Sequence, residues 1–144
     1  MKIGRYFTRL RLEYLARRAL GRGDARGAAE RLARLEARFG LAPIQEAELA
    51  TALLRSGKPD AAQRRFAALQ KKMGAEPEER YVQKYCRYYL ALMRDERSQA
   101  AYEWRLAQAI TPVLKSRKRL PMEPVREKAR PGVVATLSLD DRGA

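Results

Sequence analysis

The amino-acid types that this chain lacks exclude most catalytic chemistries. It contains no histidine and no asparagine, and Cys86 is its only cysteine among 144 residues. Without histidine, the usual general base, the Ser-His-Asp and Cys-His nucleophile arrangements and the commonest metal ligand are all missing. A single cysteine forms neither an internal disulfide nor a multi-cysteine zinc site. We therefore expect a protein that is not an enzyme and that uses no cofactor or metal.

Long apolar runs are also missing. No segment approaches the ~20 apolar residues of a membrane span. The N-terminal sequence MKIGRYFTRLRLEYLARR lacks the uninterrupted apolar region of a secretory signal. Together with the lone cysteine, which fits a reducing compartment, this predicts a cytoplasmic protein. The basic N-terminus leaves two alternatives open, an organelle transit peptide and an anchor on a membrane surface.

The charge is strongly positive and unevenly distributed. The chain has 31 basic and 17 acidic residues, a formal net charge of +14. Residues 1–40 hold 11 basic and 4 acidic residues, and residues 115–144 hold 8 and 4, so both ends are basic. This balance favours acidic partners, whether nucleic acid, an anionic membrane or an acidic protein surface. The abundance of arginine and alanine is equally typical of a GC-rich genome.

A helix-turn pattern occurs twice with a fixed spacing. In each copy a glycine is followed five residues later by an alanine and then by two large apolar residues at helical intervals. A spacing of 34 residues is the period of one stacked helix-turn-helix unit. The matching pairs are Gly23 and Gly57, Ala28 and Ala62, Leu32 and Phe66, and Leu35 and Leu69.

Apolar periodicity predicts three helical hairpins. The first has helices over residues 8–20 and 25–39. The second has a helix beginning at Pro43 and another that Asp60 caps and that ends near Lys71 and Lys72. The third shows the pattern more weakly, with four extra residues. The predicted fold is therefore all-α, with antiparallel helix hairpins stacked one after another. We expect residues 120–144 to form a flexible tail, in which the segment VVATL is able to form a strand or dock into a groove.

These repeats resemble the tetratricopeptide repeat, or TPR, family. The resemblance rests on the 34-residue spacing, on the glycine turn, alanine and large apolar residue of each unit, and on the small residues Ala16 and Ala50 of the first helices. It covers residues 9–112 as units of about 9–40, 43–74 and 81–112. The resemblance implies that the hairpins stack as a short right-handed solenoid. The implied organisation is a TPR-like domain over residues 1–114 followed by a basic, proline-containing tail over residues 115–144.

The resemblance implies a scaffold or adaptor that binds a peptide or helix in a concave groove lined by the first helix of each unit. The absence of asparagine argues against the subgroup that clamps chaperone carboxylates. Carried over to this sequence, the groove residues are Leu10, Glu13 and Arg17, then Ile44, Ala47, Thr51 and Arg55, and finally Val82, Tyr85, Tyr89 and Met93. Their arginines and tyrosines suit an acidic or amphipathic segment of another protein.

Tyrosines at positions 81, 85, 88 and 89 alternate with basic residues in the third predicted hairpin. Such a stripe is typical of a helix core or interface, and it also fits stacking on single-stranded nucleic acid. We expect Cys86 to be a small buried apolar residue. The sequence therefore predicts a non-enzymatic protein-interaction module. A basic RNA- or ribosome-associated protein is the alternative, and binding to a membrane surface through the N-terminal helix is a third. The partner and the oligomeric state are not predicted.

Overall fold

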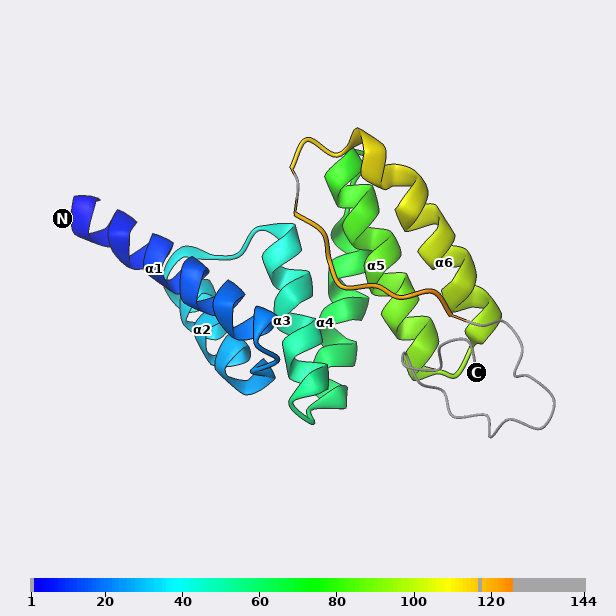
Figure 1. Cartoon of the computed structure of the whole chain (residues 1–144), viewed down its shortest axis with the longest axis horizontal. Helices are drawn as coiled ribbons and strands as arrows, with labels where there is room; N and C mark the ends of the chain where they lie inside the picture. Colours follow the sequence, from blue (N-terminus) through cyan, green and yellow to red (C-terminus); the bar gives the residue numbers. More distant parts are fainter. Residues whose placement is uncertain (1, 117, 126–144) are drawn as a thin grey trace. The chain divides into compact units, whose positions relative to one another are not determined.

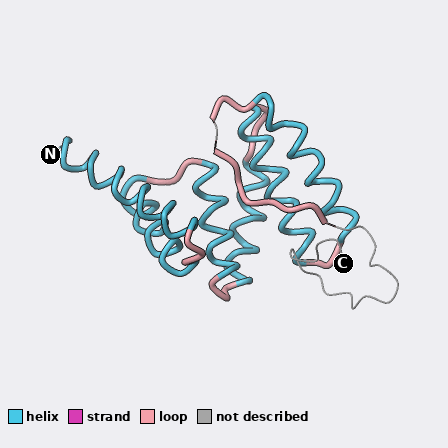
Figure 2. Tube along the Cα trace, viewed as in Figure 1, coloured by secondary structure: helices cyan, strands magenta, loops and turns pink. Residues whose placement is uncertain are grey.

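The computed structural model describes residues 2–116 and 118–125, and this part of the chain is entirely helical apart from its turns and connections (Figures 1 and 2). The prediction of an all-α protein is confirmed. The segment VVATL lies outside the described residues. The elements are α1 (Lys2–Gly21), α2 (Ala25–Phe39), α3 (Pro43–Arg55), α4 (Pro59–Lys72), α5 (Pro77–Met93), α6 (Arg97–Ile110) and the 3-10 turn η1 (Thr111–Val113).

The same turn joins the two helices of each hairpin. Its central residue has a positive φ, of 76° at Gly23, 88° at Gly57 and 57° at Asp95. The next residue donates its backbone N–H to a carbonyl five positions back, which satisfies a carbonyl at the end of the preceding helix. These bonds are Asp24 N to Ala19 O at 2.8 Å, Lys58 N to Leu53 O at 2.9 Å, and Glu96 N to Ala91 O at 2.9 Å.

Helix starts follow the sequence closely, with two differences. Asp24 caps α2 by accepting a 2.9 Å hydrogen bond from the Gly27 N–H, as its position predicts. Asp60 instead lies in the first turn of α4, which begins at Pro59. Helix α1 begins at Lys2, six residues before the predicted start at residue 8.

The chain forms two compact units, residues 1–65 and 66–144, with the boundary inside α4. In the first unit α2 packs against both α1 and α3. Its main core cluster contains Ala16, Leu32, Leu35 and Leu49, and a smaller cluster contains Ala19, Ala28 and Ala52. Small residues in these clusters let neighbouring helices approach closely.

An ion pair on the surface of the first unit connects α4 to α2. Arg65 contacts both carboxylate oxygens of Glu36, at 2.7 and 3.0 Å. This hydrogen bonding is the main cause that raises the pKa of Arg65 above its usual value. Both side chains remain more than a third exposed, so that solvent screening limits the pair to about 1 kcal/mol or less.

The core of the second unit is aromatic. The Phe66 ring stacks on Tyr89 with centroids 5.3 Å apart, and Tyr89 meets Tyr85 and Tyr88 edge to face at 5.0 and 5.1 Å. These side chains and Tyr81 are at most 2% exposed. The interpretation of the tyrosine stripe as core is confirmed, and its stacking on nucleic acid is excluded because covered rings offer no face to a base. Cys86 is also buried, as expected.

Part of the tail that the sequence predicts to be flexible is described by the structure, and it contacts α5. Residues 118–125, orange in Figure 1, cross the face of α5. Leu120 is only 5% exposed, and its backbone N–H donates a 2.8 Å hydrogen bond to the Tyr81 hydroxyl. The prediction considered only the prolines and charges of this segment, whereas buried tyrosine hydroxyls need hydrogen-bond partners.

We expect Ala62→Asp to destabilise the protein strongly. Ala62 is fully buried, and an aspartate there would bury an uncompensated charge at a cost of about 3 kcal/mol or more. Circular-dichroism melting should show a midpoint lower by at least about 10 °C. Gln63→Asp, at the exposed neighbouring position, is the matched control and should have a small effect. An unchanged melt for Ala62→Asp would contradict the packing of α4.

Candidate protein-interaction surface

Helix α1 has two apolar faces, and only one of them is covered. Ala16 and Ala19 are buried against the first unit's core clusters. A second set of large apolar side chains is exposed, at spacings of three and four residues that place them on one side of the helix. This α1 stripe consists of Ile3 (67% exposed), Tyr6 (61%), Phe7 (62%), Leu10 (43%) and Tyr14 (61%).

The α1 stripe is a continuous surface. Ile3 and Tyr14, at its two ends, are eleven positions apart, which corresponds to about 16 Å along the helix axis. The rings of Tyr6 and Phe7 contact each other edge to face, with centroids 6.0 Å apart. Scattered apolar residues are ordinary on a protein surface, whereas a contiguous apolar patch marks an interaction site. No other described helix exposes as many large apolar side chains.

Positive charge borders the α1 stripe. Arg17 follows Tyr14 on the same side of α1, and Arg11 and Arg18 lie four residues after Phe7 and Tyr14, beside the stripe. All three arginines are exposed. The Arg18 guanidinium also donates a 3.4 Å hydrogen bond to the Tyr14 hydroxyl, so an aromatic ring and a cation are presented together.

Glu13, the acidic residue of α1, already has partners. One carboxylate oxygen accepts a 3.1 Å hydrogen bond from Arg9 Nε, and the other accepts from Gln45 Nε2 of α3 at 3.2 Å. At the N-terminal half of the helix, Arg5 contacts the Phe39 ring of α2 and donates to the Arg38 carbonyl. These contacts fix α1 on the first unit while its other face remains open and cationic.

Most side chains of the predicted groove are buried. Leu10 belongs to the α1 stripe, Arg17 borders it, and Glu13 is half-buried at its edge. Arg55 is exposed at the end of α3. Met93 is half-buried at the end of α5. A covered side chain cannot receive a peptide, and the covered positions are Ile44, Ala47, Thr51, Val82, Tyr85 and Tyr89.

The prediction also omitted most of the α1 stripe. The predicted helix begins at residue 8, which leaves out Ile3, Tyr6 and Phe7, and Tyr14 is not among the predicted groove residues. The signal was present, since the spacing of positions 3, 6, 7, 10 and 14 is itself helical. Two apolar stripes on one helix mean that a single neighbour does not cover it.

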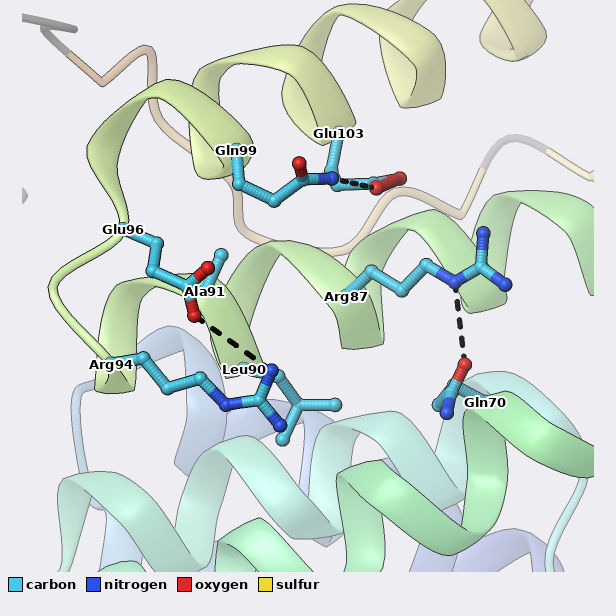
Figure 3. Close-up of a pocket in the computed structure, with 8 residues that line it drawn as sticks. All are labelled: Gln70, Arg87, Leu90, Ala91, Arg94, Glu96, Gln99 and Glu103. Atoms are coloured by element: carbon cyan, nitrogen blue, oxygen red, sulfur yellow. Dashed lines mark hydrogen bonds and ion pairs between the residues drawn. The ribbon is translucent and has the colours of Figure 1, made fainter.

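A polar hollow of about 370 Å³ lies in the second unit between the ends of α4, α5 and α6 (Figure 3). Leu90 and Ala91 contribute its apolar part. Its polar groups contact one another: Arg87 with Gln70 at 3.3 Å, Gln99 with Glu103 at 2.8 Å, and Arg94 with Glu96 at 3.8 Å. Glu103 Oε1 is buried and has no hydrogen-bond partner among the described residues. The contacts of the other groups place no nucleophile beside a base.

Comparisons with protein-family models, with curated proteins and with solved structures found no match. Among residues 2–116 and 118–125, no helix combines the length and apolar content needed to cross a membrane. The same residues contain no cluster of three or more acidic or cysteine side chains placed to hold a metal ion.

We expect the α1 stripe to contribute little to stability. Phe7→Ser combined with Tyr14→Ser should change the free energy of unfolding by less than about 1 kcal/mol, because both rings are exposed and serine has a similar helix propensity. Leu32→Ala is the contrasting variant, since Leu32 is 1% exposed and its truncation should cost about 2–5 kcal/mol. Urea unfolding measures both. If the double variant lost as much free energy of unfolding as Leu32→Ala, the stripe would be packed in the folded protein.

Proposed function

We propose that this chain is a non-enzymatic protein-interaction module that binds an acidic, amphipathic helical segment of another protein through the α1 stripe. The observation that carries the proposal is the row of five exposed apolar side chains on a helix already anchored by its opposite face. Burying such a row against a partner supplies the main favourable free energy of association.

The shape of the stripe favours a helix as the partner. Its apolar side chains recur every three to four residues over about 16 Å, the pattern that one helix presents to another or to a groove. The arginines beside it favour carboxylates on that partner, since a guanidinium binds a carboxylate through two parallel hydrogen bonds.

The composition of the stripe favours a protein over a lipid surface. Tyrosine and arginine are enriched at protein interfaces, where lysine is depleted, and they dominate the binding energy. The three exposed cations placed beside the stripe above are arginines, and Tyr6 and Tyr14 each bring a hydroxyl for a directional hydrogen bond.

We further propose that the helix hairpins form a short TPR-like array. The residues 34 apart in the sequence share the same local environment: Gly23 and Gly57 both have positive φ. The paired apolar positions Ala28 and Ala62, Leu32 and Phe66, and Leu35 and Leu69 are all at most 2% exposed. Asp95 repeats the turn 38 residues after Gly57, which supports a third, longer unit.

RNA association is the second candidate, and the same surface supports it. Exposed aromatic rings among arginines form a platform on which single-stranded bases stack. Tyr6, Phe7 and Tyr14 meet this description. The affinity of such binding falls steeply as the salt concentration rises, because the release of counterions from the nucleic acid then becomes less favourable.

The test is affinity purification of the intact chain from a cell lysate with quantitative mass spectrometry, with and without nuclease. The variant Phe7→Ser/Tyr14→Ser is compared with Tyr102→Ser, which removes an exposed tyrosine of α6. We expect the double variant to lose the captured partner at least about tenfold, as removing two hot-spot rings implies. Tyr102→Ser and nuclease should leave capture unchanged, and the bound region should map to an acidic amphipathic helix.

Three outcomes would contradict this function. Loss of all captured proteins on nuclease treatment, with direct binding of single-stranded RNA by the purified chain, would establish the second candidate. Binding to vesicles with anionic lipid that the double variant abolishes, without a protein partner, would identify a membrane surface as the ligand. Equal capture by the wild type and the double variant would exclude the α1 stripe.

A further inference from the structure

Three buried tyrosines of α5 hold an extended segment by its backbone. We name Tyr81, Tyr88 and Tyr89 the tyrosine ladder and residues 118–125 the strap. The Tyr81 hydroxyl accepts from the Leu120 N–H at 2.8 Å and donates to the Leu120 carbonyl at 3.5 Å. The Tyr88 hydroxyl accepts from the Glu123 N–H at 3.2 Å and donates to the Glu123 carbonyl at 2.9 Å.

The spacing of the ladder matches an extended chain. Tyr81 and Tyr88 are seven residues apart, which is about 10 Å along a helix. Leu120 and Glu123 are three residues apart, and three residues of polyproline II span about 9 Å. Pro121 lies between Leu120 and Glu123, and its carbonyl accepts a 3.4 Å hydrogen bond from the Tyr89 hydroxyl. Two turns of α5 therefore pair with three residues of strap.

The sequence of the strap favours an extended conformation even when the strap is not bound to the ladder. Leu120 precedes Pro121 and Glu123 precedes Pro124. A residue before proline is restricted to extended conformations, so both residues that pair with tyrosine hydroxyls are biased towards the bound shape. In a polyproline II segment, positions three apart lie on the same side, as the ladder requires.

The ladder binds the backbone of the strap through hydrogen bonds, and one apolar side chain of the strap is buried with it. Leu120 is the buried side chain of the strap. Lys118, Arg119, Pro121 and Pro124 are all exposed, while the other strap side chains are half-buried. Burial is the main influence that raises the pKa of Tyr81 above its usual value, against the Leu120 hydrogen bond and the Arg119 charge. The neutral hydroxyl is therefore retained, and it acts as donor and acceptor at once.

We propose that the tyrosine ladder is a receptor for an extended Leu-Pro-x-x-Pro segment of a partner protein, and that the strap occupies it until the partner segment displaces it. Extended proline-containing ligands bind aromatic-lined surfaces because little conformational entropy is lost. This site lies in the second unit and does not depend on the α1 stripe.

The strap is a tethered competitor for the ladder. Because it is tethered, its effective concentration at the ladder is on the order of millimolar, so that a free segment of equal affinity competes poorly. Weakening the strap should therefore expose the site without altering the ladder itself. Leu120 is the residue to change, since its side chain is the strap's buried anchor.

The binding test uses a fluorescent synthetic peptide with the sequence of residues 118–125 and the intact purified chain. We expect Leu120→Asp to bind this peptide at least about tenfold more tightly than the wild type does, measured by fluorescence anisotropy. Adding Tyr81→Phe and Tyr88→Phe to Leu120→Asp should abolish that gain, whereas adding Tyr102→Phe should preserve it. A peptide with both prolines replaced by alanine should bind severalfold more weakly.

Amide hydrogen exchange tests the ladder in the folded wild type. The Leu120 and Glu123 amides should exchange slowly, and Tyr81→Phe should release Leu120 while Tyr88→Phe releases Glu123, because phenylalanine keeps the ring and removes the acceptor. Fast exchange of both amides in the wild type would overturn the proposal. So would equal peptide binding by the wild type and Leu120→Asp, or binding that survives both tyrosine substitutions. Failure of partner capture by the α1 stripe would leave these results unaffected.

Discussion

The left-handed turn between paired helices is the constraint on which the rest of this structure depends. A positive φ reverses the chain in two or three residues, and the backbone N–H that follows closes the end of the first helix. The reversal brings two helices close together, and the fully buried alanines Ala28, Ala62 and Ala100 follow the turn at the same distance each time. Gly23 and Gly57 adopt this conformation freely, whereas Asp95 adopts it at a cost of about 1 kcal/mol.

Pairs of helices built in this way leave faces that the hairpin itself does not cover. One such face, on α5, is covered by another segment of the chain, and the other, on α1, is exposed. On α5 the uncovered face consists of tyrosines, whose hydroxyls are satisfied by the backbone of residues 120–123. On α1 it consists of aromatic and aliphatic side chains that remain exposed beside arginines. The first face shows what kind of segment this chain holds, and the second is open to another molecule.

Local features of the fold were predictable from the sequence, because they depend on neighbouring residues. The helix periodicity, the glycine turns and the Asp24 cap all involve residues within five positions of one another. The groove residues were not predictable in the same way. Apolar residues at helical spacing indicate a face but not whether another helix covers it, so that Ala47 and Val82 were assigned to a surface and lie in the core.

Long-range contacts explain the remaining differences. The strap pairs with α5 across 32 to 39 residues of sequence, a separation at which periodicity gives no information. The usable signal was chemical: four tyrosines on one helix carry four hydroxyls, and burying them requires partners from elsewhere in the chain. For α1, the second helical stripe at positions 3 to 14 was visible in the sequence once the helix was extended to Lys2.

Site-specific photo-crosslinking from the α1 stripe tests the central claim most directly. A benzophenone amino acid in place of Phe7, in the intact chain inside cells, would attach to whatever molecule contacts the stripe. The account predicts adducts with a protein, at a segment rich in Asp and Glu whose apolar residues recur every three to four positions. The same amino acid in place of Tyr102 should not form these adducts. Adducts with nucleic acid or lipid, or equal protein adducts from both positions, would contradict it.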